Sequence, residues 1–389
     1  MPRLLHMADI HLGARHQDLG EAAAQQRERQ FAAFRRAIDL ALAEKVDVVL
    51  VAGDLFDSNQ QPKRSVERAV AEFRRLAEAG IRTVLIPGTH DVYDPASIYR
   101  VHDIAAMAGQ KPGSEMVTLL TPERAEVVFP GLDLIVFGRV AATKRMAHSP
   151  LAGFSAADDP RARWRVALVH GSLRIEGKLE DDNVIFTEGE IVASGLDYLA
   201  LGHWHSFRQG RSGETTWAYA GAPEPVAVDQ DGAGQVAIVE LSEVKDQRTV
   251  VVAPRPVGRT RFQKLDVDAA EVPTQVALVD RLASLADADL VLDARVTGVE
   301  PDQLEIQDDE VERQLIGLFL KVRVRNVAVP LEPQGELPPP DTVAGAFIRD
   351  LEAQIADADA EDPARAGELR EALRLGRLLL DDPSRVTVS

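Results

Sequence analysis

The sequence predicts an α/β domain followed by a small α+β unit and a helical tail. Short apolar runs alternate with longer amphipathic stretches through the first half of the chain, which is the pattern of strands alternating with helices. Two of these predicted strands run directly into a turn that contains glycine and polar residues, and α/β sheets carry their chemistry at such strand ends. A proline-rich segment then separates two Leu- and Ala-rich amphipathic stretches from everything before them.

The elements of the main domain follow from the spacing of apolar residues. We predict strands at 4–8, 46–52 and 83–86, with helices at 25–44 and 64–79 between them. Beyond residue 110 the helical period fades, and strand-like runs follow at 132–137, 165–169, 198–201, 217–220 and 235–241. Two prolines and a glycine within 254–258 indicate that the main domain, 1–256, ends there.

The rest of the chain divides into three predicted segments. A small unit at 257–329 has strand candidates at 260–267, 290–297 and 318–324 and a helix candidate at 273–286. Residues 330–341 hold five prolines and a glycine, too many for a helix or a central strand, and are predicted to form a semi-rigid linker. The tail, 342–389, is predicted to form two amphipathic helices at 342–356 and 363–380.

Composition excludes several classes of protein. The chain has 389 residues, of which 62 are acidic and 44 basic, giving a formal net charge of −18. This sign argues against a nonspecific nucleic-acid coat, which binds phosphate through Lys and Arg. The absence of cysteine excludes disulfide scaffolds, thiolate zinc sites and cysteine nucleophiles. No apolar window reaches the ~18 residues of a membrane span and the N-terminus lacks a signal-peptide apolar region, so we expect a cytoplasmic protein without a membrane partner.

Polar clusters that contain His, Asp or Gly follow five of the predicted strands. They are Asp9-Ile10-His11, Gly53-Asp54-Leu55-Phe56-Asp57, Gly88-Thr89-His90-Asp91, His170-Gly171 and Gly202-His203-Trp204-His205. Residues i and i+2 of an extended chain share a side, so the Asp and His of the first cluster can face one point, as can the two histidines of the last. One such cluster alone is more often a turn or a satisfied polar group, but five at successive strand ends favour a two-metal centre with a bridging carboxylate.

The order of these clusters resembles the signature of the calcineurin-like metallophosphoesterases. More narrowly, ADIHLGARH, VLVAGDLFD, HG and LALGHWH followed by YAGAPEP resemble the SbcD-type DNA repair exonucleases, which work with an SbcC-type ATPase. The resemblance covers residues 1 to about 256 and extends to the next unit only by position and size. It implies an α/β four-layer sandwich, two mixed sheets flanked by helices, with 257–329 as a small α+β capping domain.

The resemblance also implies a role for each residue of the clusters. One divalent metal would be bound by Asp9, His11, Asp54 and His205, and a second by Asp54, His170 and His203, with Asp54 bridging. Manganese is the ion that the family usually prefers, and a His/Asp ligand set is also compatible with Fe, Zn or Mg. His90 would stabilise the transition state or protonate the leaving oxygen of a phosphodiester, with Asp91 orienting its ring.

One residue departs from the family pattern. The third motif of the family is GNHD, whose Asn gives an amide oxygen to the second metal, whereas this chain has Thr89 at that position. A hydroxyl is a shorter and weaker donor, so we expect the second metal to bind loosely or through a water molecule. Asp57, three residues after Asp54, stands where some relatives carry a substrate-facing His, and its role stays open.

We therefore expect a two-metal DNA phosphodiesterase, an exonuclease or endonuclease, that acts on linear or hairpin DNA ends in double-strand-break repair. The helical tail would dock on an SbcC-type ATPase, and the protein would be a homodimer. Lys321, Arg323 and Arg325 alternate along one predicted strand and form either a phosphate contact or a solvated face. The alternatives are a phosphodiesterase for small substrates such as cyclic nucleotides, and a DNA-end-binding scaffold weakened by Thr89.

Overall fold

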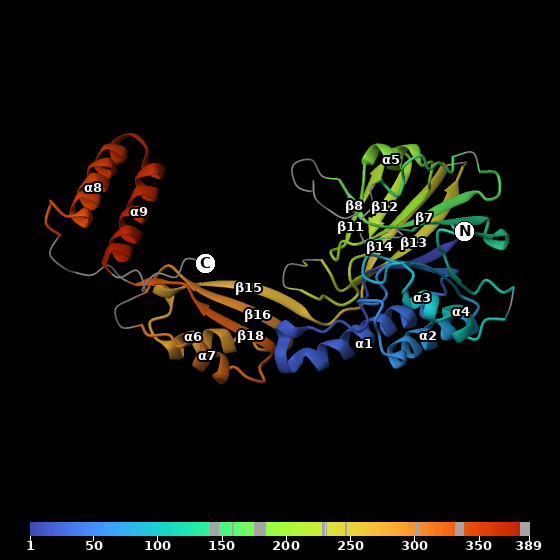
Figure 1. Cartoon of the computed structure of the whole chain (residues 1–389), viewed down its shortest axis with the longest axis horizontal. Helices are drawn as coiled ribbons and strands as arrows, with labels where there is room; N and C mark the ends of the chain where they lie inside the picture. Colours follow the sequence, from blue (N-terminus) through green and yellow to red (C-terminus); the bar gives the residue numbers. More distant parts are fainter. Residues whose placement is uncertain are drawn as a thin grey trace. The chain divides into compact units, whose positions relative to one another are not determined.

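A computed structural model of the chain describes residues 1–111, 113–140, 143, 148–157, 159–174, 184–227, 230, 232–245, 247–300, 304–330 and 338–381. The chain forms two compact units, Met1–Phe262 and Gln263–Ser389, which are coloured blue to yellow and orange to red in Figure 1. Most of the predicted linker, 331–337, and the end of the predicted tail, 382–389, lie outside the described residues. Among the helices described, none combines the length and the apolar character needed to cross a bilayer.

The first unit contains two six-stranded mixed sheets. The first sheet has the order β14 (Gln247–Pro256), β13 (Gln235–Val244), β1 (Arg3–Met7), β2 (Val48–Ala52), β3 (Arg82–Ile86) and β4 (Val117–Leu119). The second has the order β11 (Arg208–Ser212), β12 (Thr215–Tyr219), β10 (Tyr198–Gly202), β7 (Trp164–His170), β6 (Leu134–Arg139) and β5 (Glu126–Phe129). Strands β1 to β4 are parallel to one another, as are β6, β7, β10 and β12, so their carboxyl ends gather at one edge of each sheet.

Alternating side chains of the strands bury both faces of each sheet. Leu5 and Met7 of β1 pack against α1 (Ala23–Ala43) and α2 (Lys63–Glu78), while Leu4 faces the second sheet. The outer face of the second sheet packs against α5 (Glu188–Ala193). The short helices α3 (Ile98–Val101) and α4 (Ile104–Met107) complete the first outer layer. These four layers confirm the predicted sandwich.

The end of the main domain differs from the prediction. The prolines at 254 and 256 suggested a boundary, but both lie inside β14. Because β14 is an edge strand that pairs only with β13, it tolerates residues without a backbone N–H. The two compact units divide between Phe262 and Gln263 instead.

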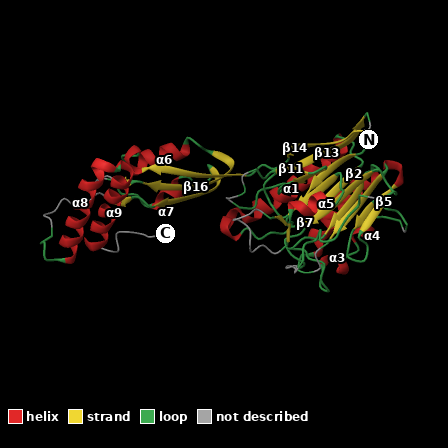
Figure 2. Cartoon of the chain, turned by 90° about the horizontal axis from the view of Figure 1, so that it is seen from above, coloured by secondary structure: helices red, strands yellow, loops and turns green. Residues whose placement is uncertain are grey.

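The second unit begins with a three-stranded sheet, β15 (Arg261–Asp268), β16 (Asp287–Thr297) and β18 (Phe319–Asn326), covered on one face by α6 (Gln275–Ala283) and α7 (Asp308–Gln314). It ends with α8 (Val343–Glu361) and α9 (Pro363–Asp381), which lie side by side in Figures 1 and 2. An ion pair of 2.8 Å between Glu352 and Arg377 joins these two helices.

The predicted cationic face of the small sheet is partly neutralised. Val322 and Val324 are buried in the core of the second unit, so the basic residues between and beside them share the opposite face. Arg325 donates to both carboxylate oxygens of Asp293, at 3.0 and 2.8 Å. Arg323 is exposed and lies opposite Asp293 in the strand register.

Candidate metal centre

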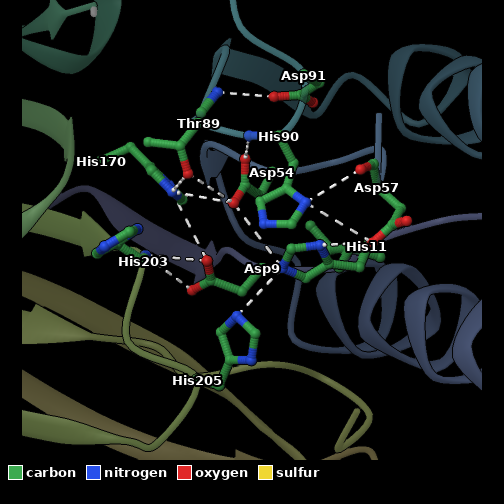
Figure 3. Close-up of polar contacts among 12 residues, drawn as sticks. Asp9, His11, Asp54, Asp57, Thr89, His90, Asp91, His170, His203 and His205 are labelled. Carbon is green, nitrogen blue, oxygen red and sulfur yellow. Dashed lines mark hydrogen bonds and ion pairs between the residues drawn. The ribbon is translucent and has the colours of Figure 1, made fainter. Parts of the chain in front are cut away.

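The five polar clusters converge where the carboxyl ends of the two sheets meet. The first three clusters follow β1, β2 and β3 of the first sheet, and the other two follow β7 and β10 of the second. In Figure 3 the side chains of Asp9, His11, Asp54, Thr89, His170 and His205 point toward one another. Residues from five separate parts of the sequence therefore share one site, as the sequence predicts.

Glycines allow these loops to approach closely. A Cβ at Gly88 would lie 2.2 Å from Oδ1 of Asp54, and a Cβ at Gly202 would lie 2.1 Å from the carbonyl oxygen of Ala52. A Cβ at Gly53 would lie 2.4 Å from Nδ1 of His170. The glycine that precedes each functional residue in these motifs is therefore needed for space.

Four of the predicted ligands have left-handed backbone conformations. The φ angle is 54° at Asp9, 49° at His11, 52° at Asp54 and 100° at His203. The N–H of Asp9 donates to the carbonyl of Gly53 at 3.2 Å, and that of His11 donates to the carbonyl of Asp54 at 3.0 Å. Such backbone is unfavourable for residues with a side chain and persists where the surroundings hold it, which is typical of functional sites.

Asp9, His11 and His205 form one group whose potential ligand atoms all lie within 4.8 Å of one another. The Nε2 atoms of His11 and His205 are 3.1 Å apart, and Nε2 of His11 is 3.8 Å from Oδ2 of Asp54. Together with Asp54, the three residues of this group are the four expected around the first metal.

Asp9, Asp54 and His170 form a second group within the same distance. Nε2 of His170 is 3.1 Å from Oδ2 of Asp54, and its Nδ1 donates to the carbonyl of Ala52 at 2.9 Å. Because Nδ1 donates to this carbonyl, Nε2 is the nitrogen that faces Asp54 and that would bind a metal once it releases its proton. The hydroxyl of Thr89 is 3.4 Å from Nε2 of His170 and 3.5 Å from Oδ2 of Asp54.

His203 lies beside these groups rather than inside them. Its backbone N–H donates to both carboxylate oxygens of Asp9, at 2.9 and 3.1 Å. Its ring meets that of His170 edge-on, with the centroids 5.2 Å apart. Trp204 stacks on Tyr219 and donates to Ser172, so it packs against the chain as predicted from its place between the two histidines.

The electrostatics of the site favour a cation. Asp9 and Asp54 are almost fully buried, and in the described part of the chain their partners are imidazoles, a hydroxyl and backbone N–H groups. Burial alone would lower the pKa of His170, but the charges of Asp54 and Asp9 outweigh it and raise that pKa to about 10. Burial acts to raise the pKa of Asp54, yet His170 and His11 hold it below its usual range.

A buried pair of carboxylates among imidazole nitrogens is the donor chemistry of Mn, Fe or Zn sites. The residues of the site therefore fit a divalent metal. From the Gly88-Thr89-His90-Asp91 cluster, only the hydroxyl of Thr89 reaches Asp54 and His170 with its side chain.

The role predicted for Asp91 is wrong. Its Oδ1 accepts the N–H of Gly88 at 2.7 Å, and its Oδ2 accepts the N–H of Phe56 at 3.1 Å and the hydroxyl of Tyr99 at 2.6 Å. These contacts tie the loop after β2 to the loop after β3, so Asp91 positions backbone and does not orient the ring of His90. Burial and the charge of Asp54 raise its pKa.

The ring of His90 contacts Asp57 instead. Its Nδ1 donates to the backbone carbonyl of Asp57 at 3.0 Å and lies 3.8 Å from the carboxylate. That carboxylate also lies 3.3 Å from Nδ1 of His11, a contact that holds the pKa of Asp57 below its usual range. Half of the His90 side chain is exposed, in contrast to the buried groups beneath it.

The sequence did not reveal Gln230 as part of the site. Its side chain lies against Nδ1 of His205 in the segment that follows YAGAPEP. A single glutamine outside any strand-end cluster carries no pattern that would single it out. Burial lowers the pKa of His205, whose imidazole is therefore neutral near pH 7.

Comparisons with known proteins agree with this geometry. The family model "Calcineurin-like phosphoesterase" matches residues 2–207. The DNA double-strand break repair protein Mre11 of Aeropyrum pernix is 32% identical over 253 residues, 62% of this chain and 58% of that protein. Mre11 of Halobacterium salinarum is 25% identical over 414 residues, 95% of this chain and 97% of that protein. The SbcD subunit of the nuclease SbcCD of Rhodobacter capsulatus is 28% identical over 323 residues, 72% and 76% of the two chains.

The extent of these matches differs among the relatives. The matched segment spans 58% of the Aeropyrum protein's own length, and 50% and 55% of two further relatives, the metallophosphoesterase YhaO of Bacillus subtilis and Mre11 of Saccharolobus solfataricus. The family model nevertheless covers more than half of this chain and includes all five polar clusters. The chain belongs to the calcineurin-like phosphoesterase family.

Proposed function

We propose that the chain is a metal-dependent nuclease that hydrolyses phosphodiester bonds of DNA in double-strand-break repair. The observation that carries this proposal is the junction of the two sheets, where two buried carboxylates and the imidazoles of His11, His170 and His205 meet. The names of the relatives, Mre11 and the SbcD subunit of the nuclease SbcCD, support DNA rather than a small phosphodiester as the substrate.

Two divalent cations fit the site, held by the residues predicted from the sequence, and manganese is our proposal for the ion. When bound in such a site, they offset the charge of the phosphate oxygens and make water a stronger nucleophile. Asp54 would contribute to the binding of both cations, because its Oδ2 lies 3.8 Å from Nε2 of His11 and 3.1 Å from Nε2 of His170.

His90 is placed to handle the proton of the leaving group. Because its Nδ1–H donates to the carbonyl of Asp57, its Nε2 carries the second proton when the ring is charged. The exposed half of the side chain makes it accessible to a bound phosphodiester. The Asp57 carboxylate lies 3.8 Å from Nδ1, and Nε2–H of the charged ring would donate to the departing oxygen.

The C-terminal helices and their acidic composition suggest a protein partner. Asp341–Ser389 has eleven acidic residues against six arginines, which suits protein docking better than DNA binding. Val343, Leu379 and Leu380 are exposed on the paired helices α8 and α9. We propose that this helical pair docks on an SbcC-type ATPase and that the working nuclease is a dimer.

Cleavage assays with the purified chain and Mn²⁺ test the proposal. We expect hydrolysis of linear duplex DNA and little turnover of a cyclic dinucleotide. Asp54→Asn should abolish cleavage, whereas Asp39→Asn, an equivalent change at an exposed residue of α1, should leave it intact. Faster turnover of the cyclic dinucleotide than of DNA would favour a small-substrate enzyme. DNA-end binding without any turnover would favour the weakened scaffold.

A further inference from the structure

The amide of Gln230 has a fixed orientation. Its Oε1 accepts the backbone N–H of Val226 at 2.9 Å and that of Ala227 at 3.3 Å. Only the oxygen of an amide can accept a hydrogen bond, so the NH₂ group must point the other way. It points to His205, where Nε2 of the glutamine lies 2.5 Å from Nδ1 of the imidazole.

This contact determines which nitrogen of His205 carries the proton. An amide NH₂ can only donate, so Nδ1 of His205 must accept and has no hydrogen. The single proton of the neutral imidazole is therefore on Nε2, the nitrogen that faces the group formed with Asp9 and His11.

The neighbouring contacts agree with this assignment. Nδ1 of His11 lies 3.3 Å from the carboxylate of Asp57, which can only accept, so Nδ1 of His11 is the protonated nitrogen. Its Nε2 then accepts the hydrogen that His205 donates across 3.1 Å. Donors and acceptors alternate without conflict from Gln230 to Asp57.

His205 is thereby unlike the other predicted ligands. In His170 the nitrogen away from the site faces an acceptor, the carbonyl of Ala52, so the nitrogen facing the site is free to release its proton to a cation. In His11 the carboxylate of Asp57 has the same effect. Metal-binding histidines need an acceptor behind them, and His205 has a donor.

We propose that Gln230 is a positioning residue that holds His205 in the tautomer unable to bind a cation. The first metal position is then formed by Asp9, His11 and Asp54 alone, and His205 joins it only when the contact with Gln230 is broken. This inference rests on the metal centre proposed above and is independent of whether the substrate is DNA.

Replacing the donor by an acceptor tests the proposal. In Gln230→Glu one carboxylate oxygen can still accept from Val226 and Ala227 while the other accepts Nδ1–H of His205. Imidazole ¹H–¹⁵N spectra of the metal-free full-length protein should show His205 protonated at Nε2 in the wild type and at Nδ1 in the variant. Calorimetric titration with Mn²⁺ should show the first cation bound about tenfold more tightly by the variant.

The added negative charge requires a control. Gln230→Glu is therefore also made in a protein that carries His205→Ala. In this background a change in Mn²⁺ affinity that acts through the imidazole disappears, whereas a change caused only by the added charge remains. We expect Gln230→Glu to leave Mn²⁺ affinity unchanged in that background. Equal tightening in both backgrounds, or a wild-type His205 protonated at Nδ1, would overturn the proposal. Absence of Mn²⁺ binding by every form would overturn the metal centre itself, while the spectra would still decide the tautomer.

Discussion

Oδ2 of Asp54 lies 3.1 Å from Nε2 of His170, although the first residue follows a strand of one sheet and the second ends a strand of the other. The two sheets of the sandwich thus meet at this contact. Because Asp54 also approaches His11, its carboxylate is the only predicted ligand expected to serve both metals.

Removing the charge of Asp54 should therefore affect both metal positions. We expect Asp54→Asn to weaken Mn²⁺ binding at both positions, because the amide retains an oxygen but not the buried negative charge. Calorimetry with the metal-free protein measures the stoichiometry and the affinities. Wild-type affinity at either position in the variant would show that Asp54 does not bridge, provided that Asp39→Asn binds like the wild type.

Thr89 should limit the second position. Its hydroxyl lies 3.4 Å from His170, and an asparagine would extend an amide oxygen further into the site. We expect Thr89→Asn to tighten the second Mn²⁺ by about tenfold, equivalent to ~1.4 kcal/mol, and to raise the rate of phosphodiester hydrolysis. Thr89→Val, which has a similar shape without the hydroxyl, serves as the opposite control. The same Mn²⁺ affinity and the same rate of hydrolysis in the wild type and in Thr89→Asn would contradict this prediction.

His90 should matter most when the leaving oxygen needs a proton. We expect His90→Ala to slow DNA cleavage by about 10²–10⁴-fold, with Mn²⁺ affinity unchanged because its ring contacts Asp57 and lies outside the two groups that contain Asp9. Bis-p-nitrophenyl phosphate, whose leaving group needs no protonation, should be affected much less. Equal losses on both substrates would instead assign His90 to phosphate binding.

Asp91 should contribute to stability rather than to proton transfer. Its carboxylate is fully buried and accepts from Gly88, Phe56 and Tyr99. Asp91→Ala leaves these donors without a partner, which should lower the free energy of unfolding by at least about 2 kcal/mol. Tyr99→Phe removes one donor and should cost about 1 kcal/mol. Urea unfolding of the metal-free proteins measures both, and a wild-type midpoint for Asp91→Ala would refute the positioning role.

Residue types at strand ends were sufficient to predict the fold class and the convergence of the site. Asp9, His11, Asp54 and His170 carry that information themselves, since parallel strands bring their carboxyl ends together. The role of Asp91 was not predictable, because its partners are the backbone N–H groups of Gly88 in its own loop and of Phe56 in the loop after β2, and the hydroxyl of Tyr99 in α3. The domain boundary was misplaced because the prolines of β14 are tolerated only on an edge strand, and sequence does not show which strands are edges.

Gln230 illustrates the same limit at the level of chemistry. Its effect on His205 depends on which end of an amide faces an imidazole, and that orientation is fixed by the backbone N–H groups of Val226 and Ala227. Strand-end motifs predict candidate ligands, whereas the atoms behind those side chains are known only from the folded chain.

The most direct test of the account is anomalous diffraction from crystals of the full chain soaked in Mn²⁺. Two peaks about 3.5–4 Å apart, with the carboxylate of Asp54 between them, are the predicted result. The absence of any peak beside Asp54, or Mn²⁺ bound only elsewhere on the surface, would contradict the metal centre and the nuclease mechanism proposed from it.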